Sequence, residues 1–200
     1  MQKLLGNLSK GLVFIVSAPA GTGKTTLVRM LTNEFSCVEE SISCTTREKR
    51  MGEINGRDYH FLSKPEFLKM IDEQDFLEHA EVFGNYYGTS RQFVIEAQNR
   101  SKHVILVIDT QGALALKKQN FEATYIFISP PSMEELKIRL INRKTENSQT
   151  LEERLSWAKH EMELSSEYDY FIINDDLQIA YEALRSIIIA EEHKRKYLHS

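Results

Sequence analysis

The sequence contains little cysteine, because its 200 residues include only Cys37 and Cys44. Two thiols cannot form the disulfide framework of a small secreted domain, and these two lack the CxxC spacing of a four-ligand zinc site. Disulfides are rare in reducing compartments, so we expect two reduced thiols, with one disulfide between them as the alternative.

Long apolar segments and an excess of one charge are absent as well. The longest early apolar run, Leu12 to Val16, is far shorter than the roughly 20 residues of a membrane span and has no signal-peptide cleavage site. The 25 basic and 29 acidic residues give a net charge of −4, so no global basic field attracts nucleic acid or anionic lipid. We therefore expect a soluble, cytoplasmic protein with neither nucleic acid nor a membrane as a partner.

The composition is that of an ordinary folded protein. Hydrophobic residues make up 42% of the chain and charged residues 27%. The length allows a substantial core, and neither a linker rich in Pro, Gly or Ser nor an internal repeat divides the chain. We expect a single domain over residues 1–200.

Short apolar runs alternate with amphipathic stretches. The runs are rich in β-branched residues and do not alternate with polar ones, which is typical of parallel strands buried on both faces. The predicted strands are Leu12–Val16, Val104–Ile108, Tyr125–Ile128 and Phe171–Ile173. The predicted helices are Lys24–Phe35, two that start at the capping pairs Ser132/Glu135 and Thr150/Glu153, and one from about Asp176 into the tail around Lys194–Lys196. This alternation predicts an α/β fold with a mostly parallel sheet flanked by helices.

Two inserts interrupt the alternation. From about residue 37 to 89 the pattern changes to short alternating segments with Gly52, Gly56 and Gly84 as turns, and a short helix with a capping box starts at Ser63. This pattern indicates a small β-rich insert. A helical insert follows at about 131–167, which leaves about 1–36, 90–130 and 168–200 as the core.

The sharpest local signal is a glycine-rich loop between the first predicted strand and a helix. It reads Ala18-Pro19-Ala20-Gly21-Thr22-Gly23-Lys24-Thr25 and matches the Walker A pattern, apart from Ala18 at the first glycine. Gly21 and Gly23 let successive N–H groups point at an anion, and the helix adds the positive end of its dipole. Lys24 can reach the β- and γ-phosphates, and the Thr25 hydroxyl can ligate Mg²⁺. We expect this loop and Thr26 to bind a nucleoside triphosphate with Mg²⁺.

Two further sites fit phosphate chemistry. Asp109 ends a predicted core strand and can hold Mg²⁺ through water, although aspartate is also common where a strand ends in a turn. Arg47 and Arg50, flanked by hydroxyls and tyrosines, can cradle a second phosphate because the guanidinium group is planar, charged and bidentate. Taken alone, Arg47 and Arg50 are more typical of a solvated basic turn than of a phosphate site.

Several motifs occur in an order that resembles one family. They are the phosphate loop, Ser43–Arg50, Gly52–Phe61, Gly84–Thr89, Ile108–Gly112 and Ser129–Ser132. From about Gly11 to Glu191 the sequence closely resembles the guanylate kinases. The resemblance implies a P-loop NTPase-type core with a GMP-binding insert and a lid. It also implies Mg²⁺-dependent ATP + GMP ⇌ ADP + GDP in purine nucleotide metabolism, with ATP and GMP as substrates and the oligomeric state undetermined.

The resemblance also implies roles for individual residues. The GMP phosphate is held by Arg47, Arg50, Tyr59 and Tyr87, and the guanine is read by Ser43, Glu78 and Thr89. The transferred phosphoryl group is neutralised by Lys24, Arg139, Arg143 and Arg154, while Asn174 lies near the adenine side of ATP. No general base is implied, because this chemistry depends on positioning and charge neutralisation.

The sequence departs from the family pattern at three positions. Val107 stands where the family usually has Asp or Glu, Thr89 replaces the common Ser, and Lys144 replaces a common Gly. Two alternatives stay open: a guanylate-kinase-like module that binds a protein, and a kinase of another nucleoside monophosphate or a P-loop hydrolase.

Overall fold

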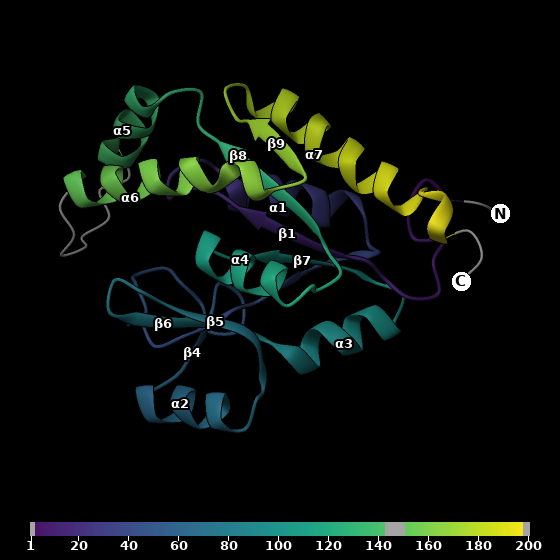
Figure 1. Cartoon of the computed structure of the whole chain (residues 1–200), viewed down its shortest axis with the longest axis horizontal. Coiled ribbons are helices and arrows are strands. Elements are labelled where there is room, and N and C mark those ends of the chain that lie inside the picture. The colour runs from purple at the N-terminus through teal and green to yellow at the C-terminus, as the bar shows by residue number, and fades with distance from the viewer. Residues whose placement is uncertain (1–2, 143–150, 198–200) are drawn as a thin grey trace.

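The computed structural model describes residues 3–142 and 151–197 (Figure 1). Its core is a five-stranded sheet with the order β2-β7-β1-β8-β9, in which every pairing is parallel. The strands are β1 (Val13–Ser17), β2 (Val38–Ser41), β7 (His103–Val107), β8 (Thr124–Ser129) and β9 (Tyr170–Ile173). The flanking helices are α1 (Lys24–Glu34), α3 (Arg91–Asn99), α4 (Thr110–Lys118) and α7 (Leu177–Glu192). The predicted α/β class is confirmed.

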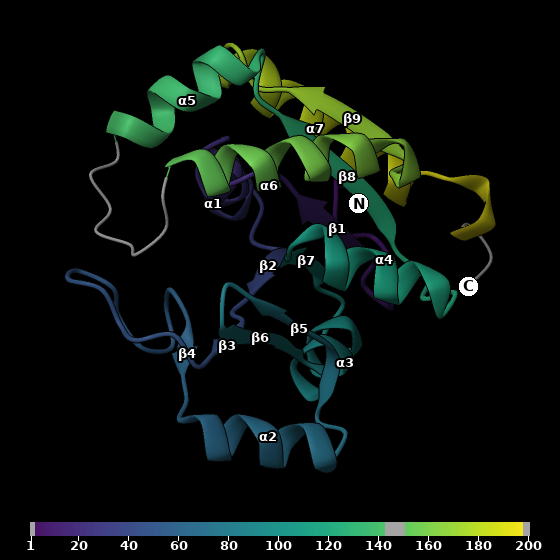
Figure 2. The same ribbon diagram turned by 60° about the vertical axis from the view of Figure 1, so that its left-hand side comes forward.

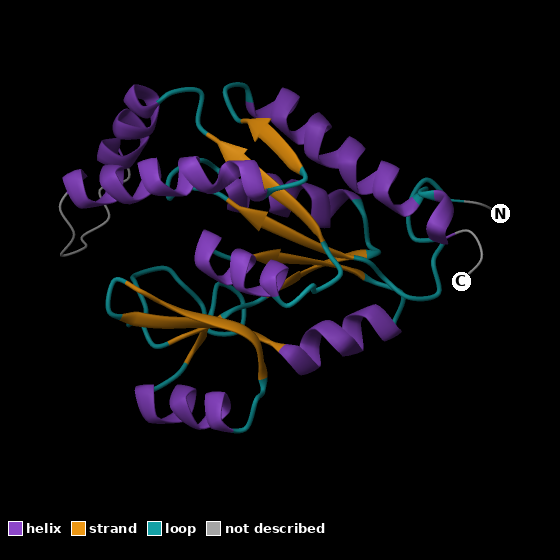
Figure 3. Cartoon of the chain, viewed as in Figure 1, coloured by secondary structure: helices purple, strands orange, loops and turns teal. Residues whose placement is uncertain are grey.

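Helices cover both faces of this sheet, as Figure 3 shows. Along β1, Phe14 and Val16 pack in one apolar cluster with α1 and α7. Val13 and Ile15 pack in the other cluster, with α3 and α4. Because both faces are buried, the core strands read in the sequence as unbroken apolar runs.

The β-rich insert forms a second sheet with the order β4-β3-β6-β5. Its elements are β3 (Cys44–Thr45), β4 (His60–Phe61), α2 (Lys64–Asp72), β5 (Phe76–Val82) and β6 (Asn85–Ser90). The stacked rings of Phe67 and Phe76, with centroids 4.4 Å apart, hold α2 against the sheet. Ser63 and Glu66 form the predicted capping box at the start of α2.

One boundary of the insert differs from the sequence-based prediction. The predicted insert starts at about residue 37, but β2 pairs with β7 in the core sheet. This strand lies at the edge of the sheet, so only Val38 and Ser41 are buried while Glu39 and Glu40 are partly exposed. Its short mixed pattern therefore resembles the insert, which begins only after Ser41.

Two helices, α5 (Met133–Asn142) and α6 (Leu151–Glu163), lie in the helical insert that is predicted to be a lid, and this segment is called the lid below. They share a small apolar core of Leu136, Leu140 and Ala158, and the 3-10 helix η1 (Leu164–Glu167) leads back to β9. Figure 2 shows the lid above the parallel sheet and the insert below it. Both extra segments therefore extend from one core.

The predicted start of α5 is only half correct. The Ser132 hydroxyl accepts the N–H of Glu135 at 3.1 Å, as expected of a cap. The Glu135 carboxylate pairs with Arg139 at 2.9 Å and does not complete the capping box. For α6, the predicted capping residue Thr150 lies outside the described residues.

The last helix starts as predicted and ends earlier than predicted. Asp176 caps α7 by accepting the N–H of Ile179 at 2.9 Å. The helix ends at Glu192, and the tail forms a separate 3-10 helix, η2 (Arg195–Tyr197). Lys194 folds back to pair with the buried carboxylate of Glu191 at 2.7 Å, which stops the helix before the charged tail.

Two expectations from composition can be compared with the structure. Cys37 and Cys44 are both free thiols, and burial raises the pKa of Cys44 to about 11. Within the described parts of the chain, no helix has both the length and the apolar character needed to cross a membrane.

A buried pair joins the two ends of the chain, which lie on the same side in Figure 1. His103 Nε2 lies 2.6 Å from the carboxylate of Glu192, and both residues are at most 3% exposed. His103 Nδ1 accepts the N–H of Leu12, so Nε2 carries the proton of the neutral ring. Glu192 also accepts the backbone N–H groups of Gly6 and Asn7. The carboxylate therefore ties the N-terminal segment and β7 to the end of α7.

We predict that Glu192→Gln lowers the free energy of unfolding by about 2 kcal/mol, because it removes charge-assisted hydrogen bonds to buried donors. The exposed Glu182 on the same helix provides the control Glu182→Gln, and urea denaturation measures both. Burial lowers the pKa of His103 below 6.5. The pKa of Glu192 is lowered below 4.5, because the hydrogen bonds to its carboxylate outweigh the effect of burial. Both depressed pKa values mean that stability is lost as pH falls, first below about 6.5 and then below about 4.5. Equal stability of Glu192→Gln and wild type near neutral pH would contradict this account.

Candidate active site

The glycine-rich loop connects β1 to α1. Gly21 and Gly23 have φ values of 94° and 92°, a left-handed conformation that side chains rarely adopt. Thr22 is buried, and its N–H and hydroxyl both donate to the carbonyl of Pro19. Lys24 Nζ donates to the carbonyl of Ala18 at 3.0 Å. The loop thus has the backbone geometry that the Walker A pattern predicts.

Asn174 supports this loop from behind. It is 4% exposed, and its side-chain amide donates to the carbonyl of Thr22 at 2.6 Å. A Cβ atom at Gly23 would lie 2.6 Å from the same amide nitrogen, so glycine is required there for space as well as for its φ angle. The sequence-based prediction placed Asn174 near adenine, whereas the described contact is with the loop backbone.

A cavity of about 310 Å³ lies where the loop, the insert and the lid meet. Its lining includes Ala18, Ala20 and Lys24 of the loop, Ser43, Arg47, Arg50, Tyr59, Glu78 and Tyr87 of the insert, Val107 and Asp109 of the core, and Arg154 of the lid. Residues predicted from four separate parts of the sequence are therefore brought together. Thr89, fully buried, lies behind Glu78 and bonds to it.

Glu53 holds the guanidinium of Arg47 and the backbone of Arg50 in place. Its carboxylate pairs with Arg47 at 2.7 Å and accepts the backbone N–H of Arg50 at 2.8 Å. The Arg47 guanidinium also lies over the rings of Tyr59 and Phe61. Desolvation opposes the charge of Arg47, but the Glu53 contact prevails and its pKa is raised. Arg47 and Arg50 together form an ordered, positively charged surface of the cavity rather than a solvated turn.

Glu78 is a buried carboxylate at the boundary between insert and core. It is 7% exposed, and the Thr89 hydroxyl donates to it at 2.6 Å. Burial, assisted by the charge of Asp109, raises the pKa of Glu78 to about 7. A Cβ atom at Gly112 would lie 2.4 Å from its carboxylate, so the first turn of α4 has no side chain where Glu78 packs.

The two carboxylate oxygens of Asp109 differ in their hydrogen bonds. One carboxylate oxygen caps α4 by accepting the N–H of Gly112 at 2.8 Å. The other, Oδ2, is buried and has no hydrogen-bond partner among the described residues. Burial raises the pKa of Asp109, while the N–H of Gly112 and the charge of Lys24 act against that shift. An oxygen with no partner beside the phosphate loop fits a site for Mg²⁺ or its bound water.

The three predicted lid arginines differ in what the structure describes. Arg154, on α6, lines the cavity. Arg139, on α5, pairs with Glu135 and donates to the carbonyl of Asn174 at 3.0 Å. This bond connects the lid to the residue that supports the glycine-rich loop. Arg143, like Lys144, lies outside the described residues.

Some residues of the cavity were not predicted from the sequence. Glu53 lies within the predicted Gly52–Phe61 motif, but the motif assigns it no role; its spacing of six residues from Arg47 and three from Arg50 is the signal that could have identified it. Glu161 is 4% exposed, and burial raises its pKa to about 7. It lies two helical turns after Arg154 and thus on the same face of α6. Phe83 and Trp157 line the cavity as well.

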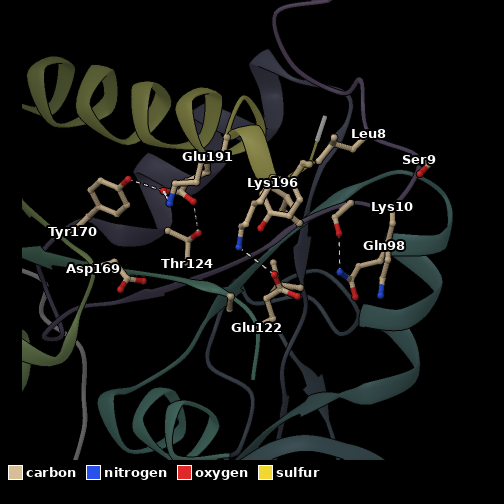
Figure 4. Close-up of a pocket in the computed structure, with 16 residues that line it drawn as sticks. Leu8, Ser9, Lys10, Gln98, Glu122, Thr124, Asp169, Tyr170, Glu191 and Lys196 are labelled. Carbon is tan, nitrogen blue, oxygen red and sulfur yellow. Dashed lines mark hydrogen bonds and ion pairs between the residues drawn. The ribbon is translucent and has the colours of Figure 1, made fainter. Parts of the chain in front are cut away.

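A larger cavity, of about 600 Å³, lies at the amino ends of the strands of the parallel sheet (Figure 4). Its polar groups bond to one another: the partly exposed Tyr170 and Thr124 both donate to the buried carboxylate of Glu191. Lys196 pairs with Glu122 at its rim. Because parallel α/β sheets bind ligands at the carboxyl ends of their strands, the smaller cavity is the candidate site.

The fold and the site define a P-loop nucleotide-binding protein with two additional segments over the loop. The guanylate kinase family model matches residues 10–191, so the chain belongs to the guanylate kinase family. The chain is 58% identical over 189 residues to the guanylate kinase of Protochlamydia amoebophila, covering 94% of this chain and 95% of that relative. Its identity to the guanylate kinase of Chlamydia trachomatis serovar D is 50% over 186 residues, with 92% and 90% covered. The crystal structure of guanylate kinase from Anaplasma phagocytophilum is similar as well, with a TM-score of 0.78, 34% identity, and 95% and 90% covered.

These matches confirm the family resemblance and the kinase class that it implies, and they do not favour the protein-binding module.

We predict that Glu78→Gln stabilises the protein at about pH 8 and has little effect at about pH 5. The raised carboxyl pKa of about 7 means that the folded state favours the protonated group, so wild-type stability falls as pH rises from about 4.5 to about 7. The neutral amide avoids this loss, which is on the order of 3 kcal/mol at about 1.4 kcal/mol per pKa unit. Urea denaturation at both pH values measures it, and Glu81→Gln, at an exposed position of the same strand, is the control. Equal destabilisation at both pH values would show that burial does not perturb Glu78.

Proposed function

We propose that this chain transfers the γ-phosphoryl group of ATP to a phosphate oxygen of GMP, yielding ADP and GDP. The single observation that carries the proposal is the shared cavity. It places the phosphate loop, the Arg47–Glu53–Arg50 group and the buried Glu78 carboxylate around one space. Two phosphate-binding regions beside a base-reading carboxylate suit a reaction between two nucleotides.

The donor triphosphate is bound by the loop from Ala18 to Thr26. The left-handed glycines turn backbone N–H groups toward the phosphates, and Lys24 exchanges its contact with the Ala18 carbonyl for phosphate oxygens. Asn174 acts on ATP through the loop that it supports. Thr25 and, through water, Asp109 would hold Mg²⁺, which when bound neutralises and bridges phosphate oxygens.

The acceptor phosphate is bound by Arg47, Arg50, Tyr59 and Tyr87. The arginines stay charged, and the phenol of Tyr59 keeps its proton at neutral pH because burial raises its pKa, so these groups supply donors to the phosphate. Glu53 fixes the Arg47 guanidinium and the Arg50 backbone before the ligand arrives, which lowers the entropy lost on binding.

The guanine is read by Glu78, with Ser43 beside it and Thr89 as its hydrogen-bond partner. A carboxylate accepts bonds from the N1–H and N2–H₂ groups of guanine, which adenine does not offer in the same pattern. Val107 presents an apolar surface to the cavity where the family usually has a carboxylate. Selectivity for guanine therefore depends more on Glu78 in this chain than in relatives that have the second carboxylate.

Phosphoryl transfer itself requires charge neutralisation more than covalent chemistry. Lys24 and Arg154 supply positive charge from opposite sides of the cavity, with Arg143 as a further lid cation. Arg139 acts by docking α5 on Asn174. The lid also excludes water, which limits hydrolysis of ATP. Taken with the composition, the proposal is of a cytoplasmic enzyme of purine nucleotide metabolism.

We predict that ADP forms from ATP and Mg²⁺ only with GMP, and not with AMP, UMP or CMP, as acceptor. Lys24→Ala abolishes this activity, because the charge that follows the migrating phosphoryl group is lost. A coupled assay for ADP measures both, and retained GMP binding shows that the variant is folded. Comparable rates with AMP would establish a broader nucleotide kinase, and no ADP with any acceptor would favour the binding-module alternative.

We also predict that Glu53→Gln raises the KM for GMP about tenfold, with a smaller change in kcat. The Arg47 guanidinium loses the charged partner that orients it, and the Arg50 backbone N–H loses a charged acceptor; about 1.4 kcal/mol of binding energy corresponds to the tenfold factor. Steady-state kinetics at saturating ATP measures the effect. Glu48→Gln, at an exposed position of the same turn, is the control and leaves the KM unchanged.

A further inference from the structure

An aromatic contact joins the GMP-binding insert to the lid. The ring centroids of Phe83 and Trp157 lie 5.5 Å apart at an interplanar angle of 63°, an edge-to-face arrangement. Phe83 lies in the turn between β5 and β6, and Trp157 lies on α6. Both residues line the candidate cavity, so the contact bridges its two sides.

The backbone conformation at Phe83 is one that disfavours a bulky aromatic residue. Phe83 and Gly84 have φ values of 51° and 75° and connect Val82 to Asn85, its partner in the ladder. A two-residue hairpin turn with two positive φ angles favours Asn or Asp at the first position. A bulky aromatic residue is uncommon there, and this one is also 49% exposed. Neither turn formation nor core packing accounts for a phenylalanine at this position.

The two ends of the contact are connected to groups that face the nucleotides. The hairpin that ends in Phe83 carries Glu78 and Tyr87. On α6, Arg154 and Trp157 are three residues apart and thus on one helix face. Where the Trp157 ring rests on Phe83, the rotation of α6 about its axis is fixed, and the direction of Arg154 is fixed with it.

We propose that Phe83 and Trp157 are positioning residues that couple the GMP-binding hairpin to the placement of Arg154. This inference rests on the proposed function and adds a specific link within it. When the insert holds GMP, the hairpin presents the Phe83 ring to α6, and Trp157 seats Arg154 over the transferring phosphoryl group.

The test is a double-mutant cycle on kcat. Phe83→Asn removes the ring and suits a positive φ angle, so folding stability is retained or increased. Trp157→Ala removes the opposite ring. Each single change lowers kcat about three- to tenfold, the range expected for one aromatic pair, and leaves the KM for ATP within about twofold. The double variant loses no more than either single variant, because the contact can be broken only once. Phe83→Tyr and Trp157→Phe keep the rings and retain wild-type kcat within about twofold.

A spectroscopic measurement gives a second readout. Trp157 is the only tryptophan in the chain, so its emission reports the contact directly. Titration of GMP into the wild type is expected to change this emission, and the change is lost in Phe83→Asn. Single effects on kcat that multiply in the double variant, or single variants with wild-type kcat and emission response, would overturn the proposal. A wild type without GMP-dependent ADP formation would instead reject the proposed function, before any variant is compared.

Discussion

The burial of the Glu78 carboxylate is the constraint on which the site depends. The side chain sits where the insert meets the core, bonded to Thr89 on the insert and packed against Gly112 at the start of α4. Burying a carboxyl group there raises its pKa to about 7, which means that the folded state holds it at a loss of stability at higher pH. Such an arrangement is typical of a group reserved for a ligand rather than for the core.

The rest of the molecule divides the work between a fixed core and two attached segments. At the amino ends of the parallel strands, Glu192 and His103 tie both chain ends to β7 with buried hydrogen bonds. At the carboxyl ends, the glycine loop and Asp109 line the cavity. The insert and the lid each have a small apolar core of their own, and Leu77 of β5 joins the insert to the core cluster beneath it.

Much of this organisation could be predicted from the sequence because it is local. The phosphate loop is specified within eight consecutive positions, Ala18 to Thr25, and the core strands are apolar because both of their faces are covered. The cap at Asp176 and the capping box at Ser63 are likewise set by neighbours a few residues away. The family resemblance supplied the residue roles, which local patterns alone left open.

The errors arose where distant segments decide the outcome. The edge strand β2 belongs to the core because it pairs with β7, some sixty residues later, and its short mixed pattern does not show this. The bond of Asn174 to the carbonyl of Thr22, 152 positions away in the chain, was likewise not predicted, while its place near the adenine side of ATP stays a prediction. The Glu135 carboxylate turns to Arg139 because that arginine is already held by the Asn174 carbonyl. None of these partners is visible within a single helical or strand period.

The most direct test of the central claim is the number of protons released when GMP binds. A carboxyl group with a pKa of about 7 is roughly half protonated at about pH 7, and it must ionise to accept the guanine N–H groups. Calorimetric titration of GMP in two buffers of different ionisation enthalpy measures this release. The account predicts that the wild type releases roughly half a proton more per GMP than Glu78→Gln at about pH 7, and that this difference nearly vanishes at about pH 8, where Glu78 is already ionised. Binding of GMP with the same release in the wild type and in Glu78→Gln at about pH 7 would contradict it.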